Sequence, residues 1–204
     1  SLNITSPYKN IAYKSADFKD EYSEITKNSN FLIFENNRLN AYNTDYFAFQ
    51  KIFSNLNFDK KDQILIFGAG DTAFLITKIL NSYGYYNLNF VVRDKIKVKN
   101  DFFKNNQNLI LFNELKSLKP FQLLINTVPK ININISMIFD NPNIQIIDAI
   151  YKNPFLNKFS KNYISGYKWL IYQAIPAITK SYNIELDFEK IDSLMKNNRC
   201  KFNV

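Results

Sequence analysis

The sequence contains no histidine, which removes the usual general base of enzymes built on Ser-His-Asp or Cys-His groups. Any acid–base chemistry must therefore use lysine, aspartate, glutamate, tyrosine or cysteine side chains. The single cysteine, Cys200, can form no disulfide within the chain, and one cysteine without histidine does not favour a zinc site. We expect no metal, and a reducing, cytoplasmic setting.

Long apolar runs are also missing. Runs such as Ile64–Phe67 and Leu123–Ile125 are far too short to cross a bilayer. The first residues show no charged segment followed by an apolar one, so no secretory signal is visible. We therefore expect no membrane partner.

Arginine is scarce, although the formal net charge is +8. A strong positive charge raises the possibility of nucleic-acid binding. Here the lysines are scattered among many asparagines, and no basic block or arginine-rich segment is present. The pattern favours a bias of composition, and we expect no nucleic-acid partner.

The residues that are present predict a folded α/β protein. Hydrophobic residues make up 46% of the 204 residues and aromatic residues 16%, which excludes a disordered chain. The apolar run Gln63–Phe67 ends in Gly68-Ala69-Gly70, and apolar residues at helical spacing follow over Asp71–Tyr83. A second apolar run, Asn89–Arg93, completes a βαβ unit.

Further segments extend this pattern. More strands are predicted over Leu109–Phe112, Leu123–Thr127 and Gln145–Ile150, which favours a Rossmann-like, doubly wound parallel sheet. The first part of the chain predicts a β-hairpin followed by a helix, and the last part predicts two helices. Their ranges are Phe31–Phe34 with Arg38–Tyr42 for the hairpin, and Asp45–Leu56, Gly166–Tyr182 and Asp187–Asn197 for the helices.

The glycine turn predicts a dinucleotide site. Gly68-Ala69-Gly70-Asp71-Thr72-Ala73 fits the pattern G-x-G-x-x-G/A between a strand and a helix. In this pattern the first glycine permits a tight turn, the second lets the backbone approach a pyrophosphate, and a small third residue lets the helix pack closely on the strand. The helix N-terminus then offers N–H groups to the phosphates. The alternative is a tight turn without a ligand.

The end of the next strand bears on the choice of cofactor. An acidic residue there binds the ribose hydroxyl of NAD, whereas an arginine accommodates the 2′-phosphate of NADP. Arg93 and Lys97 together favour NADP, and the adjacent Asp94 leaves NAD open. The alternative is an Arg–Asp pair on the surface.

Several separated motifs resemble those of the shikimate dehydrogenase family. They occur in family order over essentially the whole chain and are specific jointly rather than singly. They are Asn3-Ile-Thr5-Ser-Pro7-Tyr-Lys9 (N-V-T-x-P-x-K), Tyr42-Asn43-Thr44-Asp45 (N-T-D), the loop Gly68–Ala73, Val92-Arg93-Asp94 (N-R-T), Asn126-Thr127, Asp148-Ala-Ile-Tyr151 (D-x-x-Y) and Gly166–Ala174 (G-x-x-M-L-x-x-Q-A).

The resemblance implies an enzyme that reduces 3-dehydroshikimate to shikimate with NADPH, a step of aromatic amino-acid (chorismate) biosynthesis. Lys9 and Asp45 would be the catalytic pair, and a homodimer is possible. The family's substrate contacts map onto Thr5, Asn30, Tyr151 and Gln173. Its cofactor contacts map onto Gly68, Ala69, Gly70, Asp71, Thr72, Ala73, Arg93, Lys97, Thr127, Gly166 and Trp169.

Without the resemblance these residues have ordinary explanations. Lys9 would be a solvated surface lysine, and Asp45 would be the N-cap of the helix that follows. Thr5 and Asn30 would be turn residues, and Tyr151 would belong to an aromatic core.

The resemblance also implies two domains. The substrate domain would comprise 1–44, completed by 167–204, and the dinucleotide domain 45–166. The smaller domain would be incomplete, because the family's S-x-S motif precedes N-V-T-x-P-x-K and is not found in these residues. We expect a fragment of a longer protein rather than a degenerate relative.

Three single residues depart from the family pattern: Phe31 replaces a threonine, Trp169 a methionine and Asp94 a threonine. Asp94 leaves open an NAD-preferring quinate/shikimate dehydrogenase. The missing S-x-S segment leaves open a catalytically impaired dinucleotide-binding remnant.

Overall fold

The computed structural model describes residues 1–104, 108–117, 120–131, 135–139 and 143–197, and Cys200 lies outside these ranges. The chain divides into two compact units, the first formed by Ser1–Lys51 with Leu170–Val204 and the second by Ile52–Trp169. The chain passes from one unit to the other within helices α3 (Thr44–Ser54) and α6 (Gly166–Tyr182).

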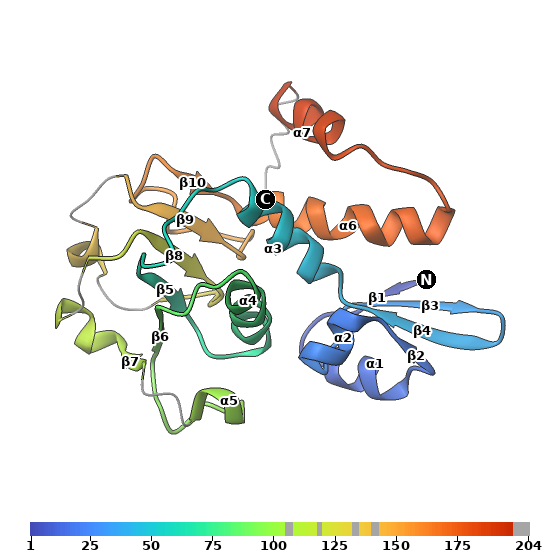
Figure 1. Ribbon diagram of the computed structural model, residues 1–204, viewed down its shortest axis with the longest axis horizontal. Coiled ribbons are helices and arrows are strands. Elements are labelled where there is room, and N and C mark those ends of the chain that lie inside the picture. Colours follow the sequence, from blue (N-terminus) through green and yellow to red (C-terminus); the bar gives the residue numbers. More distant parts are fainter. Residues whose placement is uncertain (105–107, 118–119, 132–134, 140–142, 198–204) are drawn as a thin grey trace. The chain divides into compact units, whose positions relative to one another are not determined.

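The second unit is a parallel sheet of six strands. Figure 1 shows the strands in the order β10-β9-β8-β5-β6-β7, and every neighbouring pair is parallel. With the strands numbered along the chain from β5 and read across the sheet from β7, this order is 3-2-1-4-5-6, the order of dinucleotide-binding folds. The strands are β5 (Ile64–Phe67), β6 (Leu88–Val92), β7 (Leu109–Leu111), β8 (Leu123–Asn126), β9 (Gln145–Asp148) and β10 (Tyr163–Ile164).

Apolar side chains account for this sheet. All four residues of β5 are buried, as expected for a strand of a parallel sheet that has neighbours on both sides. Helix α4 (Asp71–Ser82) follows β5 and buries six side chains. These elements and the α/β class are predicted by the sequence, and both predictions are confirmed. The short helices α5 (Asp101–Lys104), η1 (Phe112–Ser117) and η2 (Ser136–Ile138) were not expected.

The first unit contains a mixed sheet of four strands in the order β1-β3-β4-β2. Its centre is the expected hairpin, β3 (Phe31–Glu35) with β4 (Arg38–Tyr42). Asn36 and Asn37 connect the strands, and both have positive φ, as a tight hairpin turn requires. The outer strands are β1 (Leu2–Asn3), antiparallel to β3, and β2 (Phe18–Lys19), parallel to β4.

Helices complete the first unit. Helices α1 (Lys9–Ser15) and α2 (Glu21–Thr26) were not expected from the sequence, whereas α7 (Phe188–Asn197) was. Ala12 and Ala16, four residues apart, pack with Leu32 and Ala41 of the hairpin in a small core. These small residues bring the segment that contains Lys9 close to the sheet.

Candidate active site

Lys9 and Asp45 form an ion pair inside the first unit. Lys9 is the first residue of α1, and its Nζ lies 2.5 Å from Oδ2 of Asp45 in the first turn of α3. The side chains are 20% and 11% exposed, so the pair is largely shielded from water yet within reach of a small molecule. A lysine held in this way can donate a proton to an oxygen atom or stabilise negative charge on it.

Asp45 is not the N-cap of its helix, so that alternative is wrong. Helix α3 begins at Thr44. The N–H of Thr44, which has no partner within the helix, donates to Oδ1 of Asn30 at 2.7 Å. A side chain distant in sequence thus accepts the first N–H of the helix, and the Asp45 carboxylate pairs with Lys9. The start of a helix also stabilises negative charge through its dipole.

The expected substrate residues of the first unit lie on connected segments. Asn30 is 6% exposed and donates from Nδ2 to Thr44 Oγ1 at 3.0 Å and to Gln173 Oε1 at 3.5 Å. Backbone bonds join its neighbourhood to Lys9 (Ser29 N to Lys9 O, 3.0 Å) and to the Thr5 segment (Ile4 N to Asn30 O, 2.8 Å). Thr5 is exposed, and Gln173 is half-buried.

The glycine loop in the second unit has the backbone that a phosphate requires. Gly68 has φ +110°, and a Cβ at this residue would lie 2.3 Å from Oγ1 of Thr127, so only glycine fits. A Cβ on Gly70 would have no atom within 4 Å, so the backbone faces open space. Ala73 is fully buried, which lets α4 pack closely on the sheet.

This loop lies where the strand order of the sheet reverses. β5 pairs with β6 on one side and with β8 on the other, and ligands of open α/β sheets bind at the carboxyl ends of such strands. The N-cap residue Gly70 has no side chain to bond the first N–H groups of α4, so they can bind phosphate oxygens. The loop therefore fits a dinucleotide.

The residues after β6 lie in a turn that Asp94 stabilises. Its Oδ1 accepts from the N–H of Ile96 at 2.9 Å, and its Oδ2 lies 3.6 Å from Nζ of Lys97. Both Arg93 and Lys97 are exposed. The Asp94 carboxylate is thus hydrogen-bonded to the backbone of its own turn and paired with a lysine.

A buried carboxylate, Asp148, joins the ends of three strands. Its Oδ1 accepts from Asn126 Nδ2 and from the Ile150 N–H, both at 2.9 Å, and its Oδ2 accepts from the Tyr163 hydroxyl at 3.0 Å. Burial raises the pKa of Asp148 above its usual range, and burial together with Asp148 raises the pKa of Tyr163. The motifs around Asn126 and Asp148 were noticed in the sequence, but the contribution of Tyr163 was not.

Gly166 fits tightly against the turn that follows Asp148. A Cβ on Gly166 would lie 2.4 to 2.6 Å from backbone atoms of Ile150 and Tyr151, so only glycine can begin α6 here. The ring of Tyr151 lies 6.0 Å from that of Tyr167, and Trp169 is buried.

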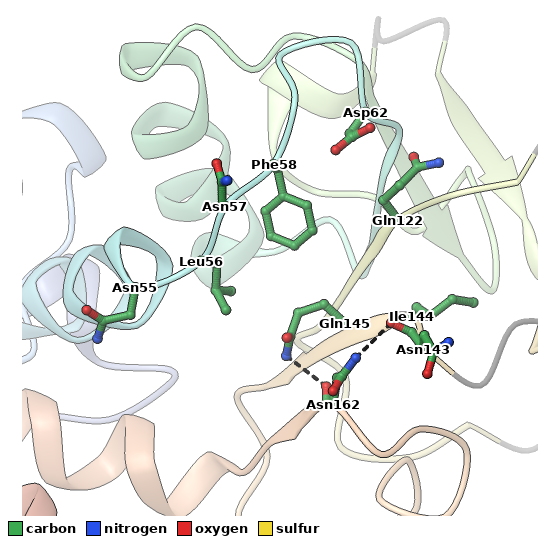
Figure 2. A pocket seen from close by; sticks show the side chains of 10 residues that line it. All are labelled: Asn55, Leu56, Asn57, Phe58, Asp62, Gln122, Asn143, Ile144, Gln145 and Asn162. Carbon is green, nitrogen blue, oxygen red and sulfur yellow. Dashed lines mark hydrogen bonds between the residues drawn. The ribbon is translucent and has the colours of Figure 1, made fainter.

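A separate recess of about 400 Å³ lies in the second unit (Figure 2). Its residues Asp62, Gln122, Ile144 and Asn162 precede strands β5, β8, β9 and β10, so it is formed at the amino ends of the strands. Carboxamide side chains dominate its lining, and Gln145 Nε2 donates to the Asn162 carbonyl at 2.7 Å. Because dinucleotides bind at the carboxyl ends, this recess is distinct from the glycine loop.

The strand order and the glycine loop define the class: this is a Rossmann-type, dinucleotide-binding α/β protein, and its first unit carries a lysine–carboxylate pair. No protein-family model matches the chain. It is 26% identical to a shikimate dehydrogenase (NADP(+)) of Clostridium perfringens, over 98% of this chain and 79% of that protein. The chain is therefore similar to shikimate dehydrogenases over nearly its whole length.

Solved structures share the fold of this chain. A chorismate mutase/shikimate 5-dehydrogenase fusion protein from Clostridium acetobutylicum matches with a TM-score of 0.79 and 22% identity, over 96% of this chain and 76% of that chain. The shikimate 5-dehydrogenase of Thermus thermophilus, solved in complex with NADP(H) and shikimate, matches with a TM-score of 0.74 and 17% identity, over 96% and 77%. The resemblance drawn from the sequence motifs is confirmed.

Proposed function

We propose that this chain is an NADP-dependent shikimate dehydrogenase, which reversibly reduces 3-dehydroshikimate to shikimate. The observation that carries the proposal is the shielded Lys9–Asp45 pair in a chain without histidine that also has the Rossmann strand order and glycine loop. When bound, NADPH supplies the hydride that reduces the carbonyl carbon.

The residues of the chain have separate tasks in this proposal. The Lys9 ammonium donates a proton to the reacting oxygen, and Asp45 holds the ammonium in place. Thr5, Asn30 and Gln173 bind substrate hydroxyls, and Tyr151 also binds the substrate. The backbone from Gly68 to Ala73 binds the pyrophosphate, while Thr127, Gly166 and Trp169 contribute to the nicotinamide side of the site.

The proposed preference for NADP depends on the turn after β6. Arg93 and Lys97 supply positive charge for the 2′-phosphate. The Asp94 carboxylate accepts from Ile96 N and lies near Lys97, which reduces its repulsion of a phosphate. The same carboxylate, next to the end of β6, is the observation that favours the second candidate, an NAD-preferring quinate/shikimate dehydrogenase.

Steady-state rates test the proposal. The purified chain is assayed for shikimate oxidation with NADP and with NAD, and for quinate oxidation with each cofactor. We expect shikimate with NADP to give the largest kcat/KM. A larger value with NAD would favour the second candidate, and NADPH binding without turnover would indicate a dinucleotide-binding remnant.

Three further features stay predictions: the domain bounds 1–44 with 167–204 and 45–166, a homodimer, and a cytoplasmic location.

A further inference from the structure

The Asp148 carboxylate lies beyond the residues to which the proposed function assigns a task. It is fully buried at the end of β9, and the register aligns it with Asn126 of β8 and Phe67 of β5. A buried carboxylate is costly unless its oxygens are hydrogen-bonded, and three donors meet this one. It therefore connects the backbone turns on both of its sides.

The first connection leads to the glycine loop. The Asn126 side chain donates to Asp148 and also bonds both backbone groups of Val128, each at 3.1 Å. These bonds shape the turn that contains Thr127, whose hydroxyl donates to the Phe67 carbonyl at 2.6 Å. The same hydroxyl oxygen lies against Gly68, where no Cβ fits.

The second connection leads to the start of α6. Asp148 Oδ1 accepts from the N–H of Ile150 and so fixes the turn after β9. Backbone atoms of Ile150 and Tyr151 lie so close to Gly166 that no Cβ fits between them. The position of this turn thus sets the position of Gly166.

We propose that Asp148 is a positioning residue for the dinucleotide, because its carboxylate holds the Thr127 turn and the Ile150 turn in one arrangement. Through Asn126 it fixes the wall of the glycine loop, and through Ile150 it fixes the backbone beside Gly166. The inference rests on the proposed function, because it concerns the same cofactor.

The test measures NADPH binding to the full chain by calorimetry, together with thermal stability. We expect Asp148→Ala to raise the Kd of NADPH at least tenfold. Asp148→Asn should restore binding to within about twofold, because its carboxamide oxygen can accept the bonds from Asn126 and Ile150 and its NH₂ group can donate to the Tyr163 hydroxyl. The matched control is Ile146→Ala, which shortens another fully buried side chain of β9.

The outcomes separate positioning from stability. A Kd that rises with Asp148→Ala but not with Ile146→Ala, at a similar loss of thermal stability, supports the proposal. Equal rises in both variants, or none with Asp148→Ala, would overturn it. If Asp148→Ala does not fold, Asn126→Ala opens the same network from β8, and unchanged binding there would equally overturn it. A wild-type chain that does not bind NADPH would instead refute the proposed function, and this inference with it.

Discussion

At the scale of single residues, Asp45 holds the Lys9 ammonium in one place, and in the proposed function this ammonium meets a substrate oxygen. The distance of 2.5 Å and the limited exposure of both side chains indicate a fixed position rather than a mobile surface lysine. By contrast, Lys27 and Glu24 form an exposed ion pair in the same unit, with side chains 61% and 48% exposed. Exposed pairs of this kind contribute little to stability or position.

We predict that Asp45→Asn lowers kcat for shikimate oxidation by about 10²-fold, within the range of acid–base effects. The carboxamide keeps the shape of the side chain but loses the charge that orients Lys9. The Kd of NADPH should stay within about twofold, because Asp45 is not among the residues assigned to the cofactor. Steady-state kinetics checks this, with Glu24→Gln as the control. An unchanged kcat would remove Asp45 from the site.

Asp148 also makes stability depend on pH. Burial raises its pKa in the folded chain above the ordinary value of 3.8. The folded state therefore binds more protons than the unfolded state between these two pKa values, and stability falls as pH rises through that window. In the Asp148→Asn variant, the side chain at position 148 does not titrate.

We predict that the unfolding free energy of wild type minus that of Asp148→Asn decreases as the pH rises from about 4. Above the pKa of Asp148 in the folded chain, this difference should no longer change. Urea unfolding of both proteins at several pH values measures this difference. A difference that increases with pH would mean that the folded chain favours the ionised carboxylate.

At the scale of elements, the glycine loop differs from an ordinary tight turn, because its two positions are glycine for different physical reasons. Gly68 is required by the fold, since φ is +110° and Thr127 lies in the way of a side chain. Gly70 is not required by the fold, because a Cβ there would meet nothing. A ligand phosphate close to the backbone explains the second glycine.

We predict that Gly70→Ala leaves the unfolding free energy within about 1 kcal/mol of wild type but raises the Kd of NADPH at least tenfold. The added methyl group would occupy the space of a phosphate. Gly84→Ala is the matched control. A Cβ on Gly84 would also have space, but Gly84 has φ +83° and lies after α4, away from the glycine loop in sequence. It should lose stability and keep its NADPH affinity. Normal binding by Gly70→Ala would argue against a phosphate at this loop.

The elements that the sequence predicted are those with a strong apolar pattern. β5, β6 and β8 are short apolar runs, and α4 has apolar side chains at helical spacing. Helices α1 and α2 have only seven and six residues, and few of their side chains are apolar. Such short helices depend on tertiary contacts, as Ala12 and Ala16 show, and these contacts are not visible in a local pattern.

At the scale of the whole molecule, the candidate site combines residues that are distant in sequence. Asn30 and Gln173 are separated by 143 positions, yet their side chains lie within hydrogen-bond distance. Motif order suggested them, because a family pattern carries this information, whereas composition and periodicity do not. The link between Asp148 and Tyr163 belongs to no single motif, and only the pairing of β9 with β10 brings them together.

The net charge of +8 allows a further prediction. Because the positive charge is scattered rather than gathered in a block, we expect no measurable binding to duplex DNA at physiological ionic strength. Fluorescence anisotropy of labelled DNA, titrated with the chain at several salt concentrations, checks this. Tight binding that weakens steeply with salt would indicate a nucleic-acid site.

The central claim is that Lys9 performs the proton chemistry of an NADP-dependent shikimate dehydrogenase. The most direct test compares kcat for shikimate oxidation in wild type, Lys9→Ala and the control Lys27→Ala, with NADPH affinity measured in all three. We predict that Lys9→Ala lowers kcat by about 10²- to 10⁴-fold at unchanged NADPH affinity, while Lys27→Ala behaves as wild type. A Lys9→Ala variant with normal kcat would contradict the account.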